Sequence, residues 1–170
     1  MEKKEKSKAR QGSYSPPLKM LADEHVQIKK LIALIPAIAK SLDLKNPGDI
    51  KAVTDCVDFI RNYADRFHHA KEEDILFKYF DENLDILKAM HEDHATGRNH
   101  VRAILEALDK SDSESVAEHL LKYAELLTEH IKKEDEVKGL TFGEYCRIRD
   151  ERLREFNRNP WSRLTIGVGR

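Results

Sequence analysis

Four long stretches of the chain repeat apolar residues at intervals of three and four, and this pattern constrains the fold more than any other feature. Such spacing marks one face of an α-helix. The predicted helices span 18–42, 50–80, 84–108 and 115–138. The breaks between them are short and rich in Asn, Asp, Pro, Gly and Ser. Helices joined by short loops pack as antiparallel neighbours, so we expect an all-α fold, an up-down-up-down four-helix bundle.

The two ends of the chain lack this regular pattern. Residues 1–17 are charged and polar and finish in Ser and Pro, which predicts a disordered N-terminal tail. The bundle domain is expected to cover residues 18–138, with Gly139 ending its last helix. The remaining part, 139–170, should form a C-terminal extra helix over about 142–156, outside the bundle, followed by an irregular tail.

Composition excludes several classes of protein. A chain of 170 residues with 40% hydrophobic residues can bury the core of one soluble domain. A net charge of −1 gives no general attraction to nucleic acid or to an acidic membrane. No apolar run approaches the roughly 20 residues that a membrane span needs. The two cysteines lie far apart and form no C-x-x-C pattern, which favours a reduced, cytoplasmic setting.

Histidines and carboxylates recur at one-turn spacing inside the predicted helices. His68 precedes Glu72 by four residues, and His130 precedes Glu134 by four. Residues at this spacing lie one above the other on a helix and can reach one point beside it. Each of the other two helices carries a histidine within its apolar stripe, His25 and His94. Four helices that each direct such a side chain inward predict a metal site within the bundle.

The segment HHAKEE at 68–73 offers two candidate pairs, and the helical angle selects one of them. At about 100° per residue, His68 and Glu72 fall within roughly 45° and 85° of the centre of the apolar stripe. His69 and Glu73 fall roughly 145° and 180° away from it. We therefore expect His68 and Glu72 to point into the core, and His69 and Glu73 to face water.

The donor set indicates which metals fit. Neutral imidazole and carboxylate suit iron, manganese and zinc. A carboxylate has two oxygens and can bridge two ions, so Glu72 and Glu134 are candidate bridges from opposite helices. A single histidine on an apolar face is more often a hydrogen-bonded core residue. Several inward histidines together with two buried carboxylates are harder to explain without a metal, because unpaired buried carboxylates are strongly disfavoured.

These segments resemble the hemerythrin-like, HHE cation-binding family. The matching pieces are DEH at 23–25, FHHAKEEDILF at 67–77, DHATGR at 93–98 and HIKKED at 130–135. The resemblance implies two non-haem iron ions with an oxo or hydroxo bridge, although zinc or manganese would also suit the donors. The ligands it implies are His25, His68, Glu72, His94, His130 and Glu134.

One position departs from the pattern of the oxygen-carrying members. These proteins have a further histidine one turn before the residue that matches His94, whereas this chain has Met90 there, with His91 beside it. Either His91 turns inward or one iron lacks a ligand and is more open. The carriers also use a carboxylate five residues after the histidine that matches His130, which makes Asp135 an alternative ligand to Glu134.

The resemblance implies a protein that binds dioxygen or nitric oxide for sensing, storage or detoxification. Replacement of the carrier histidine by Met90 favours diatomic reactivity or sensing over reversible oxygen carriage. The alternatives are a di-iron enzyme (a peroxidase, an oxidase or a nitric oxide reductase), an iron-handling or repair protein, and a structural bundle that holds zinc or no metal. We favour ligand binding over catalysis. The sequence identifies no protein partner.

Overall fold

The computed structural model describes residues 16–80 and 82–139, and within these ranges the regular structure is entirely helical. The long α-helices are α1 (Pro16–Lys40), α2 (Pro47–Phe59), α3 (Asp85–Asp109) and α4 (Ser113–Gly139). The all-α prediction is confirmed for this part of the chain. The helix predicted over 142–156 and nearly all of the predicted N-terminal tail lie outside the described residues. Pro16 and Pro17, which were assigned to that tail, instead open α1.

The second helical rod is not an α-helix along its whole length. α2 continues directly into the π-helix η1 (Ile60–His69), and after two residues a second π-helical segment, η2 (Glu72–Leu76), follows. The rod ends in a 3₁₀ turn, η3 (Phe77–Tyr79). The backbone N–H of Ala70 donates to the carbonyl of Asp65, five residues earlier. Each residue of such a segment turns through less than it would in an α-helix, so the rod presents a different face along η1.

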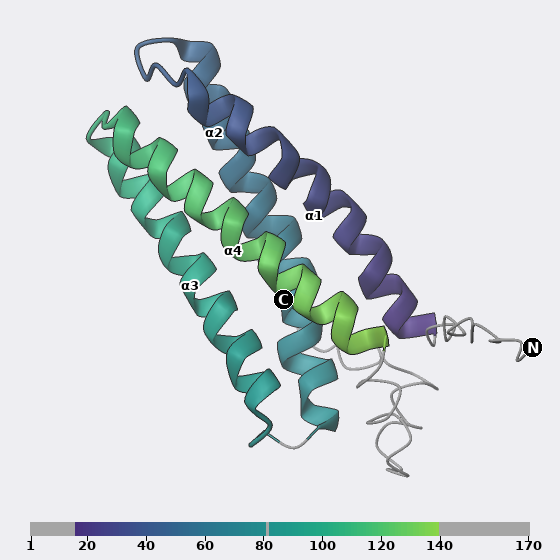
Figure 1. Cartoon of the computed structure of the whole chain (residues 1–170). Coiled ribbons are helices and arrows are strands. Elements are labelled where there is room, and N and C mark those ends of the chain that lie inside the picture. Colours follow the sequence, from purple (N-terminus) through teal and green to yellow (C-terminus); the bar gives the residue numbers. More distant parts are fainter. Residues whose placement is uncertain (1–15, 81, 140–170) are drawn as a thin grey trace, which may run out of the picture.

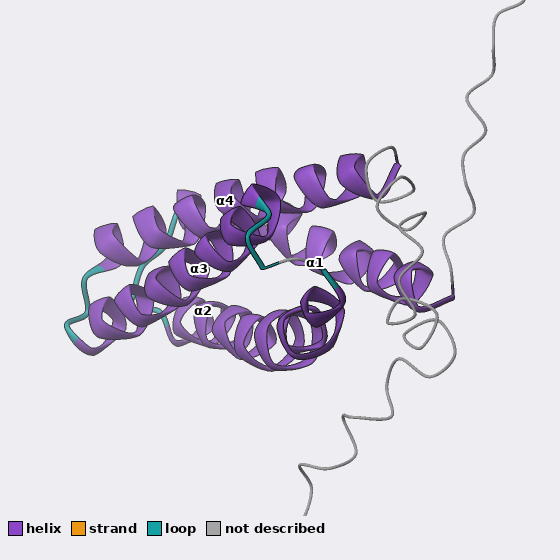
Figure 2. Ribbon diagram, turned by 90° about the horizontal axis from the view of Figure 1, so that it is seen from below, coloured by secondary structure: helices purple, strands orange, loops and turns teal. Residues whose placement is uncertain are grey.

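The helices lie side by side in one bundle, and α4 packs against both α1 and α3. Figure 1 shows the α1–α2 and α3–α4 connections together at one end, and the start of α3 at the other. Seen from below, the rod that contains α2 lies beside α1 and α3 (Figure 2), and both of these helices contact its η1 segment. Among the described residues, no helix combines the length and the apolar character needed to cross a bilayer.

Two separate apolar clusters form the core. The larger one joins all four helical rods in the half that holds the α1–α2 and α3–α4 connections, and its fully buried side chains include Ile35, Val53, Ile104, Val116 and Leu120. The smaller one lies around the start of α1, the segments η2 and η3, and the start of α3, and includes Leu21, Ile75, Leu76, Leu87 and Met90. Along each helix, the buried histidines and carboxylates fall next to or between members of these clusters.

Side-chain caps define where two helices begin. The Asn46 side chain accepts the N–H of Gly48, so Asn46 is the cap of α2. Asp49 lies three residues further on, in the first turn of the helix, and its carboxylate accepts the N–H of Asp43 in the preceding turn. At α4, the Asp112 carboxylate accepts the N–H of Ser115 at 3.1 Å. Each cap accepts a hydrogen bond from a backbone N–H that has no partner within the first turn of the helix.

We predict that Asp112→Ala lowers the free energy of unfolding by about 1 kcal/mol, the usual loss when an N-cap side chain is removed. Urea unfolding followed by circular dichroism measures the change. Asp109→Ala is the matched control, because Asp109 is an exposed residue at the other end of the same loop, at the C-terminus of α3. An Asp112→Ala variant as stable as the native chain would contradict the capping role.

Candidate metal centre

A layer of polar side chains lies between the two apolar clusters. Every one of these side chains is at most 7% exposed, although the layer contains carboxylates and imidazoles. They fall into two groups, and within each group one donor atom from every residue lies within 4.8 Å of all the others. One group is His69, Glu72, His94 and His130, and the other is His25, His68, Glu72 and Glu134. We call them the three-histidine group and the two-histidine group.

The spacing of donor atoms fits ligands that share an ion. The Nε2 atoms of His94 and His130 are 3.1 Å apart, and the Nε2 atom of His25 lies 2.9 Å from a carboxylate oxygen of Glu134. Two ligands about 2.1 Å from one ion, at right angles to each other, are separated by roughly 3.0 Å. Both pairs match this separation, whereas two neutral imidazole nitrogens at this distance without an ion must share a proton.

Glu72 belongs to both groups and joins them. Its side chain is 0% exposed. One carboxylate oxygen lies 3.6 Å from Nε2 of His68, and the other lies 3.5 Å from Nε2 of His94. These histidines belong to different groups, so the two oxygens of one carboxylate face two separate sets of donors. This is the arrangement expected of a carboxylate that bridges two metal ions.

The histidines are oriented by carboxylates on their far side. The Nδ1 atom of His68 lies 2.9 Å from Glu24, and that of His94 lies 2.7 Å from Glu73. The Nδ1 atom of His130 lies 3.2 Å from Asp93. A carboxylate on one ring nitrogen fixes the tautomer and leaves the other nitrogen free to ligate, which is the usual arrangement behind metal-binding histidines.

Cations neutralise these outer carboxylates in turn. Lys71 is buried and pairs with Glu24. Lys133 lies 3.0 Å from Asp93. Arg98 donates to Glu73 at 2.8 Å, and its Nε also donates to Asp65 at 2.8 Å. From the centre outward, a buried carboxylate is therefore followed by an imidazole, an outer carboxylate and a cation.

His69 completes the three-histidine group. Its ring stacks on that of His94, with centroids 3.9 Å apart, and its Nδ1 faces the Asp65 carboxylate at 3.8 Å. Burial lowers the pKa of His69 to about 3 and also lowers the pKa of His94, so both rings are neutral. The Nε2 atom of His69 is buried and has no hydrogen-bond partner among the described residues. A buried lone pair of this kind is costly unless it binds something, and a metal ion fits it.

Side chains at the edge of the layer remain charged. Contact with His69 and hydrogen bonds from Arg98 hold the pKa of Asp65 at about 2 against the opposing effect of burial. Burial also opposes ionisation of Glu73, but hydrogen bonds from His94 and Arg98 outweigh it and hold the pKa of Glu73 at about 2. Both carboxylates are therefore ionised at neutral pH. Glu73 accepts a hydrogen bond from the ring of His94, whereas Asp65 faces the ring of His69 at 3.8 Å.

All of the residues predicted as principal ligands come together in the two groups, but the predicted exposure of two neighbours is wrong. His69, expected to face water, is 4% exposed and lies in the three-histidine group. Glu73, also expected in water, is partly buried and bonded to His94. The angle calculation assumed an α-helix throughout, whereas η1 is a π-helix that rotates His69 inward. The pattern of apolar residues carried no signal of this change.

The structure also decides between the alternatives at the third helix. His91 is exposed, its ring contacts Phe77 with centroids 5.1 Å apart, and it belongs to neither group. The site nevertheless has a third histidine, because His69 of the second rod belongs to the three-histidine group. The side chain of Asp135, the alternative to Glu134, lies outside the described residues. Glu134 itself is 6% exposed and belongs to the two-histidine group.

Comparison with known families agrees with this geometry. The hemerythrin HHE cation binding domain model matches residues 17–138. The chain belongs to this family. The match covers α1 to α4 and all seven residues of the two groups, and it implies that the domain binds a cation. No significant match was found among curated proteins or among solved structures.

The metal-free domain should lose stability as the pH falls from 7 towards 3. Its buried His69 takes up a proton only near pH 3, whereas the unfolded chain takes it up near 6.5, so the unfolded state binds more protons between these values. His94, Asp65 and Glu73 act in the same direction, because each has a lowered pKa. One such group contributes a slope of at most about 1.4 kcal/mol per pH unit.

Urea unfolding of metal-free protein at several pH values between 7 and 4 measures this slope. His69→Gln should show a shallower slope than the native chain, whatever its stability at pH 7. His91→Gln is a suitable control, because His91 is exposed and lies outside both groups. Stability that stays constant or rises as the pH falls would contradict the burial of neutral imidazoles.

Proposed function

We propose that the chain is a non-haem di-iron protein that binds dioxygen or nitric oxide, for sensing, storage or detoxification. One observation carries the proposal: the buried carboxylate of Glu72 has its two oxygens directed at histidines of different groups. One ion would be held by the three-histidine group and the other by the two-histidine group. Glu134, whose carboxylate oxygen lies 2.9 Å from His25 and 3.8 Å from His130, also faces both groups.

The donors support iron. They are all imidazole nitrogens and carboxylate oxygens, a set that suits iron and manganese and that also binds zinc. The only cysteine in the described part of the chain, Cys56, lies in the larger apolar cluster, and burial raises the pKa of its thiol to about 11. Within residues 16–80 and 82–139, no thiolate therefore takes part in the proposed site.

Iron, when bound, would supply the reversible redox chemistry and the coordination position that dioxygen or nitric oxide requires. The described residues do the rest. The outer carboxylates hold each histidine ring in one tautomer, and Arg98 ties Asp65 to Glu73 so that the rings of His69 and His94 stay stacked. The apolar clusters on both sides of the layer limit the entry of bulk water.

Metal analysis of the purified protein tests the proposal. We expect about two irons per chain, as in other two-metal sites, together with visible absorption from the iron centre. Glu72→Gln removes the shared ligand and should lose both ions. His69→Gln should lose the ion of the three-histidine group and retain about half of the metal.

Asp74→Asn is the matched control for these variants. Asp74 follows Glu73 in the same segment, but its side chain is exposed and pairs only with Lys78 across one turn. This variant should retain the full metal content. A colourless native protein without iron would refute the proposal, and full metal content in Glu72→Gln would refute the shared carboxylate.

One observation favours an enzyme as the second candidate: a pocket of about 360 Å³ reaches the three-histidine group from the surface. A reactant larger than a diatomic gas can enter it. Adding nitric oxide, dioxygen or hydrogen peroxide to the iron-loaded protein separates the two functions. We expect a stable spectral change that reverses when the gas is removed. Multiple turnovers of peroxide or nitric oxide per protein would instead establish an enzyme.

A further inference from the structure

Two further histidines face each other across α3 and α4, outside both groups of the metal centre. The Nδ1 atom of His100 lies 3.1 Å from the Nδ1 atom of His119, and the ring centroids are 5.3 Å apart. His100 follows His94 by six residues, which places it roughly 9 Å further along α3. It is also turned roughly 120° around the helix from His94. The pair is therefore separate from the buried centre.

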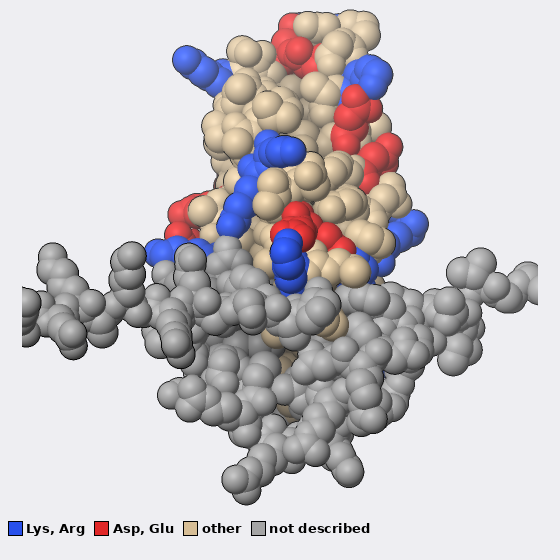
Figure 3. Space-filling model, turned by 90° about the vertical axis from the view of Figure 1, so that its right-hand side faces the viewer, with Lys and Arg blue, Asp and Glu red and all other residues tan. Residues whose placement is uncertain are grey.

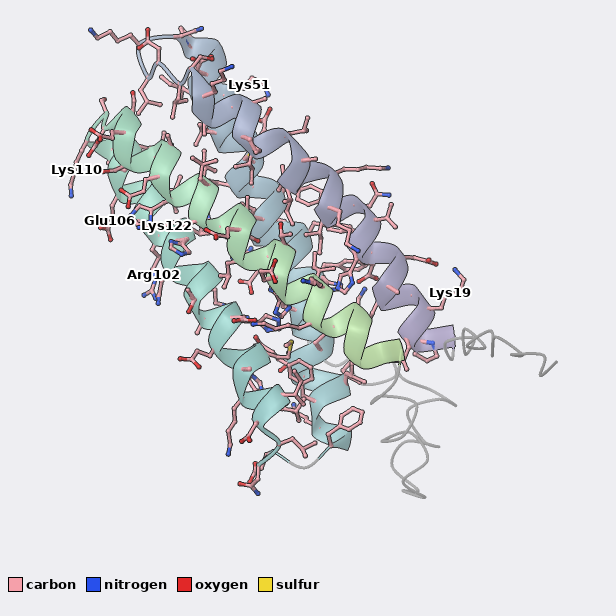
Figure 4. All side chains as sticks on the ribbon, viewed as in Figure 1. Lys19, Lys51, Arg102, Glu106, Lys110 and Lys122 are labelled. Atoms are coloured by element: carbon pink, nitrogen blue, oxygen red, sulfur yellow. The ribbon has the colours of Figure 1, made fainter. Side chains whose placement is uncertain are left out.

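Two packed helices hold these rings opposite each other. α3 packs against α4, and both histidines lie well inside their helices and are partly buried. Figure 4 shows Lys122, three residues after His119, and Arg102, two residues after His100, in the half of the bundle that holds the α3–α4 connection. The separation of the two Nδ1 atoms is therefore set by helix packing and not by a loop.

The distance between the two nitrogens is that of two ligands on one metal ion. Ligands about 2.1 Å from an ion, at right angles to each other, are separated by roughly 3.0 Å. Without an ion, two neutral imidazoles at this distance share one proton, which one Nδ1 donates to the other. Because both rings are partly exposed, this proton can move through water to Nε2 of the same ring. Both Nδ1 lone pairs are then available to an ion.

The charges beside the pair permit a cation to bind. Burial lowers the pKa of His100, and His119 and Lys122 lower it further, whereas Glu118 raises it. His100 is therefore neutral at neutral pH, and neutral imidazole is the form that binds a metal. The positive charge of Lys122 opposes a cation, but Lys122 pairs with the carboxylate of Glu118. These two charges largely offset each other beside the rings.

We propose that His100 and His119 form a second metal site, which binds one divalent late transition-metal ion through their imidazole nitrogens. Imidazole suits copper, nickel and zinc, and the affinity of such donors is highest for Cu²⁺. The protein fills two positions of the ion and water fills the others, so the ion exchanges with solution. The site shares no ligand with the buried centre, and the inference is therefore independent of the di-iron proposal.

Cu²⁺ is the probe, and His100→Gln and His119→Gln are the decisive variants. Each full-length protein is titrated with Cu²⁺ at neutral pH, and electron paramagnetic resonance counts the bound ions and their nitrogen ligands. The native chain should bind one more ion than either variant over the same range of concentration. Loss of one ligand of a chelating pair should weaken this binding at least about 100-fold. The double variant should bind no more weakly than either single variant, because one remaining histidine does not chelate.

His91→Gln is the matched control. His91 also lies on α3, but it is exposed and belongs to neither group of the centre. This variant should keep the additional copper ion, with two coupled nitrogens and native affinity. Comparison between the chains also cancels any copper that the buried centre takes up, because that centre is the same in all of them.

Bound copper should also stabilise the folded bundle. The two histidines are 19 residues apart in the chain, so unfolding separates them. An ion that binds the folded state more tightly raises the thermal unfolding midpoint. Copper should raise this midpoint more in the native and His91→Gln proteins than in His100→Gln or His119→Gln. Without copper, all four proteins should have similar midpoints and the same iron content.

Equal copper stoichiometry and affinity in the native, His100→Gln and His119→Gln proteins would overturn the inference. So would an additional copper ion that is coupled to only one nitrogen in the native chain. Absence of iron from the native protein overturns the proposed function alone. In that case, selective loss of one copper ion from the two variants still supports the second metal site.

Discussion

The structure depends on the burial of one carboxylate, that of Glu72, at the centre of the bundle. A charged group removed from water is strongly unfavourable unless neighbouring groups compensate it. Imidazoles of both groups surround it, and further carboxylates behind those rings are matched by Lys71, Arg98 and Lys133. Removing one member of such a network leaves its partner buried and uncompensated. The side chains of the polar layer therefore depend on one another. The proposed metal ions would supply positive charge that compensates the buried carboxylate of Glu72.

The π-helical segment η1 allows two adjacent histidines to serve different groups. On an α-helix, His68 and His69 would point about 100° apart, and only one would enter the core. In the π-helix, both are buried, with His68 in the two-histidine group and His69 in the three-histidine group. π-helical turns are rare and often occur at functional sites. Here His69 of the second rod belongs to the three-histidine group, and His91 of the third helix belongs to neither group.

The two groups differ in what surrounds them, and this asymmetry bears on function. The two-histidine group includes His25 of α1, and the buried pair of Glu24 and Lys71 lies behind the ring of His68. The three-histidine group adjoins the pocket lined by Tyr123 and Arg98. On the face shown in Figure 3, the described basic and acidic side chains are interspersed, without a region of one sign.

The sequence by itself determined the four helical patterns, the all-α class and the positions of six of the seven buried donors. It could do so because apolar periodicity and one-turn spacing are local properties. Only the tertiary structure decided that His69 enters the centre and that His91 stays outside. The rotation of η1 depends on backbone hydrogen bonds that side-chain spacing does not reveal. The pocket likewise is lined by residues of separate helices, which meet only when the bundle forms.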